Sequence, residues 1–309
     1  STPSAAVGAR VLALRFSMLL SHRSSTIARQ MGIIERYLIA GIDWSELSEP
    51  SWDQHTVRQE QWQLEYQDYV MFRIRQTMND EPSEGQKDAL RQTIHGRGIH
   101  MLIARFNRTC AWVASHIVRS NNIQERVAIV NKFIRIAWHC YRQGNMESLC
   151  EIMFGLQSPW IARLQQTWEQ VSLWELRAFE ALRRFTSPRE QFAFLRYSMR
   201  EAIETNIPSR RFSPLTTSSS PYVPFFGQFV SDLSAIDSLA SFVDASGMPN
   251  TMPLYDDQEL SLSWDALVNV YRLRIKSHIV REIITLQRCQ RQGPAPPMEL
   301  PILIEVLQL

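Results

Sequence analysis

The stretch of sequence that decides the fold is SSSPYVPFFGQFVSDLSAID, residues 218–237. It opens on three serines and a proline, a composition typical of a loop, and continues into Pro-Phe-Phe-Gly at residues 224–227. The segment after Gly227 is mostly apolar and is expected to be helical. This segment is either part of the core or a surface that binds another molecule.

Elsewhere the apolar residues recur with helical spacing. One stripe has the spacing i, i+3, i+7, i+10 and consists of Val127, Val130, Ile134 and Ala137. A second repeats every fourth residue and consists of Leu267, Tyr271, Ile275, Ile279 and Ile283. No stretch alternates cleanly enough for a strand, and 11 glycines are few for the tight turns of an all-β protein this long. The pattern predicts an all-α fold.

Composition and charge argue against several functional classes. The 33 basic and 31 acidic residues give a net charge of only +2, which does not favour nucleic-acid binding. The longest apolar run near the start, residues 11–20, contains Arg15 and is too short to span a bilayer. Four cysteines without paired spacing indicate reduced thiols in an intracellular protein.

No reactive site emerges from the residues. The cluster His95-Gly-Arg-Gly-Ile-His100 has neither a phosphate-binding pattern nor the companions of a zinc site. His139 and Cys140 are neighbours on a predicted helix, so their side chains point to different faces and cannot form a catalytic pair. We therefore expect no metal, no cofactor and no covalent chemistry.

The nine tryptophans are spread along the chain. Core packing is the expectation for most of them, because large aromatic side chains dominate protein interiors. The members considered are Trp44, Trp112, Trp138, Trp160 and Trp168.

Seven short blocks follow one another along the chain, within residues 28–35, 105–113, 126–130, 149–156, 163–169, 224–233 and 267–269. Their order resembles the catalytic domain of guanine-nucleotide exchange factors for Ras-family small GTPases. The resemblance places the catalytic domain at residues 21–292. It leaves residues 1–20 as an N-terminal extension, the remnant of an upstream helical module, and residues 293–309 as a C-terminal tail.

The resemblance implies a helical bowl that carries a protruding helical hairpin. Its first helix would start near Gly227, and its second would be the helix at Leu267 or the segment leading into it. In that family the first helix wedges into the nucleotide site of the GTPase and displaces switch I, while the bowl holds switch II. The resemblance thus implies a catalyst of nucleotide release that makes and breaks no covalent bond.

Site residues carried over from the family fall into three groups. Phe225 would line the pocket for a switch II side chain, although plain core packing explains it equally well. The wedge would present Ser231, Asp232, Ser234, Ala235, Asp237 and Ser238. The GTPase-binding rim would include Arg105, Gln157, Pro159 and Ala162. For Asp232, a simple helix-surface charge is as good an interpretation.

Several positions depart from the family pattern. Ser234 and Ser238 stand where some members carry a bulky apolar residue and an acidic residue, and Gln157 replaces the usual Asn. Asp237 is one candidate for the missing acidic group.

Three hypotheses follow. The first is an exchange factor for a Ras-type or Rap-type GTPase, cytoplasmic and recruited to the inner face of membranes through other domains of its parent protein. The second is an exchange-inactive interaction module of the same fold that binds a small GTPase or another signalling protein. The third is an unrelated all-α scaffold.

Overall fold

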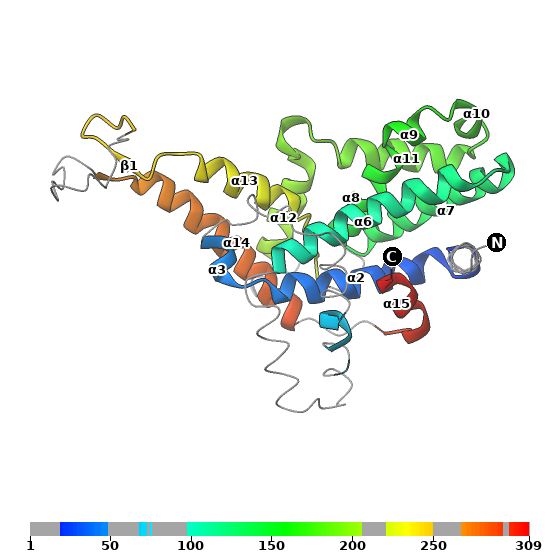
Figure 1. The fold of residues 1–309 in the computed structure, drawn as a ribbon, viewed down its shortest axis with the longest axis horizontal. Helices are drawn as coiled ribbons and strands as arrows, with labels where there is room; N and C mark the ends of the chain where they lie inside the picture. Colours follow the sequence, from blue (N-terminus) through cyan, green and yellow to red (C-terminus); the bar gives the residue numbers. More distant parts are fainter. Residues whose placement is uncertain are drawn as a thin grey trace, which may run out of the picture.

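A computed structural model of the chain confirms that the fold is all-α (Figure 1). In the part of the chain it describes, the β-strands are two short ones, β1 (Phe242–Val243) and β2 (Leu267–Val268). The residues described are 19–48, 68–72, 75, 98–205, 221–249, 267–292 and 297–308. Most of the N-terminal extension and the serines at 218–220 lie outside them.

Four helices form the centre of the body. They are α2 (Ser24–Gly41), α6 (Gly98–Arg119), α7 (Ile123–Arg142) and α8 (Met146–Leu156). Helix α6 packs against α8, and α7 packs against both α2 and α8. The stripe predicted from Val127 to Ala137 is buried in this core. Asparagine side chains cap two of the helices: Asn122 Oδ1 accepts from Gln124 N, and Asn145 Oδ1 accepts from Ser148 N.

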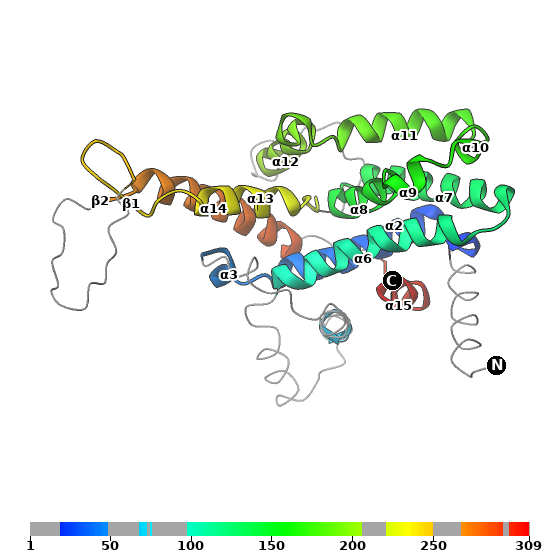
Figure 2. The same ribbon diagram turned by 45° about the horizontal axis from the view of Figure 1, so that its top comes forward.

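A second layer covers one side of this centre (Figure 2). It consists of α9 (Pro159–Ala162), α10 (Gln165–Trp168), α11 (Leu173–Phe185), a 3₁₀ turn η1 (Arg189–Gln191) and α12 (Ala193–Thr205). Three successive residues between α11 and α12 have positive φ: Glu190 at 52°, Gln191 at 55° and Phe192 at 61°. Such left-handed residues other than glycine cost conformational energy, so packing around Phe192 must hold them in place.

A helical hairpin projects from the body, with β1 and β2 near its far end (Figures 1 and 2). Its helices are α13 (Gly227–Asp237) and α14 (Val270–Gln292), so the first begins at the expected residue. The second begins after Leu267, which lies in β2. The predicted inward stripe of α14 is only partly correct. Ile279 and Ile283 are buried at the base, whereas Tyr271 near the tip is exposed.

The C-terminal segment differs from the expected tail. Residues 300–307 form helix α15 (Leu300–Leu307), which packs against α2 (Figure 1). Ile302, Leu303, Val306 and Leu307 are all buried. Because the segment carries an amphipathic apolar stripe, it covers core surface that would otherwise meet water.

Two sequence expectations concern membranes and thiols. Among the described helices, none is both long enough and apolar enough to cross a membrane. All four cysteines are free thiols. Burial raises the pKa of the Cys140 thiol well above its usual value, which opposes formation of a reactive thiolate. The side chain of Cys140 is therefore a packed core group.

Candidate functional site

Helix α13 shows two different faces. Phe229, Leu233 and Ile236 point into the molecule and are buried. On the opposite side Ser231, Ala235 and Ser238 are exposed, and Ser234 is half-buried between them. The Ser238 hydroxyl donates a hydrogen bond to the Ala235 carbonyl oxygen at 2.6 Å. The open face of α13 therefore carries small side chains, which allow another backbone to approach closely.

Asp232 joins α13 to α12. Its two carboxylate oxygens accept hydrogen bonds from both terminal nitrogens of Arg196, at 2.6 and 2.7 Å. Arg196 Nε also donates to the Gln191 carbonyl oxygen at 2.6 Å, within the left-handed turn. The hydrogen bonds to Asp232 raise the pKa of Arg196 above its usual value. In this structure the Asp232 carboxylate therefore connects α13 to α12 within the same molecule.

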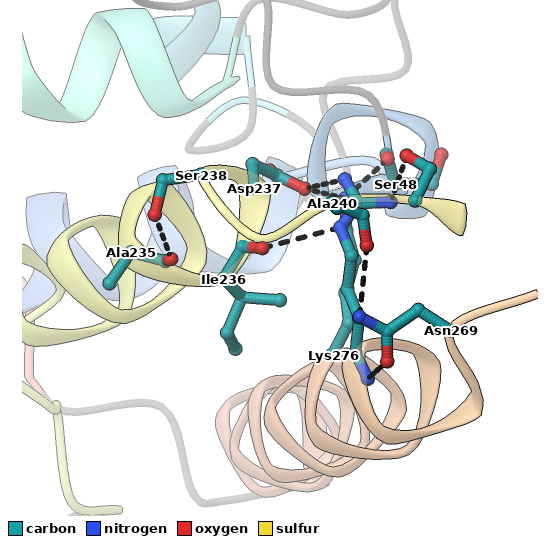
Figure 3. A network of polar contacts seen from close by, with 10 residues as sticks. Ser48, Ala235, Ile236, Asp237, Ser238, Ala240, Asn269 and Lys276 are labelled. Atoms are coloured by element: carbon teal, nitrogen blue, oxygen red, sulfur yellow. Dashed lines mark hydrogen bonds and ion pairs between the residues drawn. The ribbon is translucent and has the colours of Figure 1, made fainter. Parts of the chain in front are cut away.

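Asp237 joins α13 to α14 (Figure 3). Its Oδ1 accepts from Arg272 Nη2 and from Lys276 Nζ, both at 2.8 Å. Arg272 Nε also donates to the Ile236 carbonyl oxygen at 3.2 Å. The Asp237 side chain is only 16% exposed. It faces α14, away from the exposed serines, and this differs from the suggestion that it supplies an acidic group at the wedge surface.

A cavity of about 210 Å³ lies at the base of α13. It is mostly apolar and is lined by Leu102, Ile103, Phe106, Glu147, Phe225, Phe226, Gly227 and Val230. This volume is enough for part of a side chain from a partner. Phe225 therefore forms a wall of the cavity as well as belonging to the core.

The ring of Phe225 is held by three other phenylalanines. Its centroid lies 5.8 Å from that of Phe106, 5.9 Å from Phe154 and 5.3 Å from Phe192. A Cβ atom at Gly227 would overlap the Phe225 ring, so only glycine fits at the start of α13. The strained turn at Phe192 therefore supports one wall of the cavity.

Glu147 is the ionisable residue that lines this cavity. Its Oε2 accepts a hydrogen bond from the Phe226 backbone N–H at 2.6 Å, which connects α8 to the start of the hairpin. Burial raises the pKa of Glu147 well above its usual value, and the nearby Glu35 raises it further. The pKa shift favours a protonated carboxyl at this position.

The rim residues at the end of α8 and on α9 lie together on the surface. Gln157, Pro159 and Ala162 are all exposed. Gln157 Nε2 donates to the Met153 carbonyl oxygen at 3.0 Å, within its own helix. These three positions are available to a partner.

Sequence reasoning missed Trp160, which lies among these rim residues. It was expected in the core, but its side chain is 58% exposed, and Trp44 is 69% exposed. The sequence did contain a signal. Helix α9 has four residues, and only Ile161 is needed to anchor it in the core. An exposed tryptophan beside a predicted rim is typical of an interface anchor.

Arg105 is not a rim residue. Its side chain is 0% exposed because this face of α6 packs against α2 and its guanidinium reaches the backbone of α15. Arg105 Nε lies 3.3 Å from Glu35 Oε1, and Nη1 donates to the Val306 carbonyl oxygen at 2.9 Å. The guanidinium therefore joins three helices inside the body.

The described residues contain no group of three or more His, Cys, Asp or Glu side chains that could hold a metal ion. Both aspartates of α13 are paired with cations of the same molecule.

The sequence model and the named relatives found by comparison with known proteins indicate the same family. The sequence model of the RasGEF domain matches residues 26–274, more than half of the chain. Guanine nucleotide exchange factor LTE1 of Kluyveromyces lactis is 26% identical over 216 residues, which cover 70% of this chain and 13% of that protein.

Two further relatives align over shorter segments. Rap guanine nucleotide exchange factor 5 of Homo sapiens is 36% identical over 94 residues, covering 30% of this chain and 16% of that protein. Ras guanine nucleotide exchange factor C of Dictyostelium discoideum is 31% identical over 132 residues, covering 43% of this chain and 8% of that protein. The aligned parts of this chain thus span less than a fifth of each relative's length. The domain match, together with the hairpin that begins at Gly227, shows that the chain belongs to the RasGEF domain family.

Proposed function

We propose that this chain is a guanine-nucleotide exchange factor that binds a Ras-type or Rap-type GTPase and uses α13 as a wedge in the nucleotide site. The observation that carries the proposal is the pairing of two features on one element. The exposed small-residue face of α13 lies on the projecting hairpin, and the apolar cavity lies at the base of the same helix.

The chemistry required is binding alone. A factor that prefers the nucleotide-free GTPase weakens nucleotide affinity by the same ratio, because coupling between two ligands is reciprocal. A change in affinity of about 10⁴-fold corresponds to about 5.5 kcal/mol of differential binding. A rigid arm and a wide interface can supply this, so no covalent step is needed.

Each part of the site has a task in this mechanism. The cavity beside Phe225 receives a side chain of switch II, as the family resemblance implies. Exposed Trp160, with Gln157 and Pro159, extends the contact along the rim. The open face of α13 enters the nucleotide site.

We further propose that the wedge acts by occupying space. Ser234 and Ser238 cannot compete with phosphate for a magnesium ion as a carboxylate can. Asp232 and Asp237 are engaged by Arg196, Arg272 and Lys276. Close approach along Ser231, Ala235 and Ser238 is then what excludes the nucleotide.

The partner class rests on the names of the relatives, which include Ras and Rap exchange factors. We propose that the protein acts in the cytoplasm, at the inner face of the membranes where Ras-type proteins reside. Recruitment there would fall to other domains of the parent protein, since the relatives are much longer than the segments that align.

A nucleotide-release assay tests the proposal. GTPases of the Ras, Rap, Ral and Rho types are loaded with fluorescent GDP and mixed with the chain. At least one Ras or Rap protein should release nucleotide faster. Ala235→Arg on the exposed face of α13 should abolish this, whereas Ser277→Arg on the exposed face of α14 should leave most of it.

The same assay separates the alternatives. Binding of a GTPase without faster release would support an exchange-inactive module of the same fold. Absence of both binding and release across the panel would contradict both hypotheses.

A further inference from the structure

Helix α14 must hold the wedge helix at a fixed angle to the body. At its base α14 is anchored by Gln287, whose Nε2 donates to the Ile39 and Ile42 carbonyl oxygens, both at 2.9 Å. Arg36 Nη2 donates to the Gln290 carbonyl oxygen at 2.9 Å in the same region. The Arg196–Asp232 pair also ties α13 to α12, and an attachment further out along α14 would hold the direction of the hairpin more firmly.

Lys276 provides such an attachment (Figure 3). Its Nζ donates to Asp237 Oδ1 at 2.8 Å and to the Ser48 carbonyl oxygen at 2.7 Å. Lys276 lies eleven residues before Gln287, which is about 16 Å along a helix axis. One ammonium group therefore joins the end of the wedge helix, the second hairpin helix and the segment α3 (Trp44–Ser48).

Helix α3 is itself fastened to the body. The buried carboxylate of Glu46 accepts from Asp43 N at 3.0 Å and from Ile99 N of α6 at 2.8 Å. The acceptor for Lys276 is the backbone carbonyl of Ser48, the last residue of α3. The contact from Lys276 thus ends on a segment tied to the central helices.

The local fold does not depend on Lys276 alone. Asp237 retains Arg272 as a partner when Lys276 is removed, and Asn269 Nδ2 still donates to the Ala240 carbonyl oxygen at 2.9 Å. The two hairpin helices would therefore stay paired. What is lost is the attachment of the pair to α3.

We propose that Lys276 is a positioning residue that fixes the angle between the hairpin and the body, and that nucleotide exchange depends on this angle. The inference rests on the proposed exchange function. Lys276 faces Asp237 and α3, so it acts on the GTPase through α13.

Three variants of the full chain test the proposal. Lys276→Met removes both hydrogen bonds and keeps the length of the side chain, and Lys276→Arg keeps the charge. Arg274→Met removes a charge from an exposed position two residues earlier on the same helix. The maximal exchange rate and the half-saturating GTPase concentration are measured for each, together with the melting temperature.

Lys276→Met should lower the maximal rate about tenfold, because small misplacements of a positioned group have large effects on rate. The half-saturating concentration and the melting temperature should change little. Lys276→Arg should recover most of the rate, and Arg274→Met should match the parent. The proposal would be overturned if Lys276→Met kept the parent's maximal rate, or if it changed only the half-saturating GTPase concentration. It would also be overturned if Arg274→Met lost as much of the maximal rate as Lys276→Met.

Hydrogen–deuterium exchange supplies a readout that does not need a GTPase. Lys276→Met should speed amide exchange in residues 43–48 and 228–243, and Arg274→Met should not. If the parent protein releases nucleotide from no GTPase, the exchange function fails while this measurement still tests the attachment. Unchanged protection in Lys276→Met would overturn the attachment even where nucleotide exchange is active.

Discussion

Arg196 and Asp232 share two hydrogen bonds, of 2.6 and 2.7 Å, that connect helix α13 to α12. Their side chains are 22% and 27% exposed, so the pair is better shielded from water than an ordinary surface ion pair. Parallel hydrogen bonds between a guanidinium and a carboxylate also fix relative orientation. The pair therefore contributes to the direction of α13 as well as to stability.

Arg196→Gln and Asp232→Asn should each lower the unfolding free energy by about 1 kcal/mol and should also slow nucleotide exchange. The double variant should cost less than the sum of the two, as expected for residues in contact. Urea unfolding measures the coupling. Arg183→Gln, at an exposed pair with Glu180, is the control and should change little. Strict additivity would show that the contact is not formed in solution.

Filling the cavity should block exchange without weakening the fold. Val230→Phe places a larger side chain beside the 210 Å³ space lined by Phe225 and Phe226. We expect an unchanged or slightly higher melting temperature and a strong loss of exchange, because the cavity can no longer receive a partner side chain. Val118→Phe, at an exposed position on α6, is the matched control. Full exchange activity in Val230→Phe would remove the cavity from the interface.

Trp160→Ala should weaken GTPase binding and leave stability almost unchanged. The side chain is 58% exposed, so little core packing is lost, whereas an exposed tryptophan at an interface can contribute about 2 kcal/mol or more. The half-saturating GTPase concentration should rise, and the maximal rate should fall less. Trp44→Ala, the control, removes an even more exposed ring from α3. Equal effects of the two variants on binding would argue against a rim role for Trp160.

Glu147→Gln should reduce the dependence of stability on pH. Burial raises the folded-state pKa of Glu147 above its unfolded value, so the folded state binds more protons between these two values. The contribution of Glu147 to the unfolding free energy is therefore largest below its unfolded-state pKa, and it is lost as pH rises through its folded-state pKa. Glutamine has no such titration, and its amide oxygen can still accept from Phe226 N–H.

Denaturant titrations between pH 5 and pH 8 measure the unfolding free energies of Glu147→Gln and of the parent. This range lies above the usual carboxyl pKa of about 4.3. The two free energies should diverge as pH rises, with the variant the more stable. Glu125→Gln on the exposed side of α7 should run parallel to the parent. Parallel curves for Glu147→Gln as well would contradict the raised pKa.

Local sequence pattern accounts for much of the fold. The stripe on α7 follows directly from helical periodicity, and Pro-Phe-Phe-Gly locates the start of α13, where glycine is required by the Phe225 ring. The exposed face of α13 also follows from its spacing of small residues.

Features fixed by distant partners could not be predicted in this way. Arg105 enters the core because the Glu35 carboxylate, seventy residues away, pairs with its charge and the Val306 carbonyl accepts from its Nη1. Asp237 turns from the open face because Arg272 and Lys276 attract it from another helix. Trp160 was expected inside on size alone, although its short helix needs only Ile161 as an anchor.

Helix α15 has a practical consequence for protein preparation. The match to the family model ends at residue 274, but side chains buried in the core continue to Leu307 at the end of α15. A fragment trimmed to the family boundary would expose apolar surface on α2 and deprive the Arg105 guanidinium of an acceptor. Such a fragment would be prone to aggregate, and its inactivity would say nothing about nucleotide exchange.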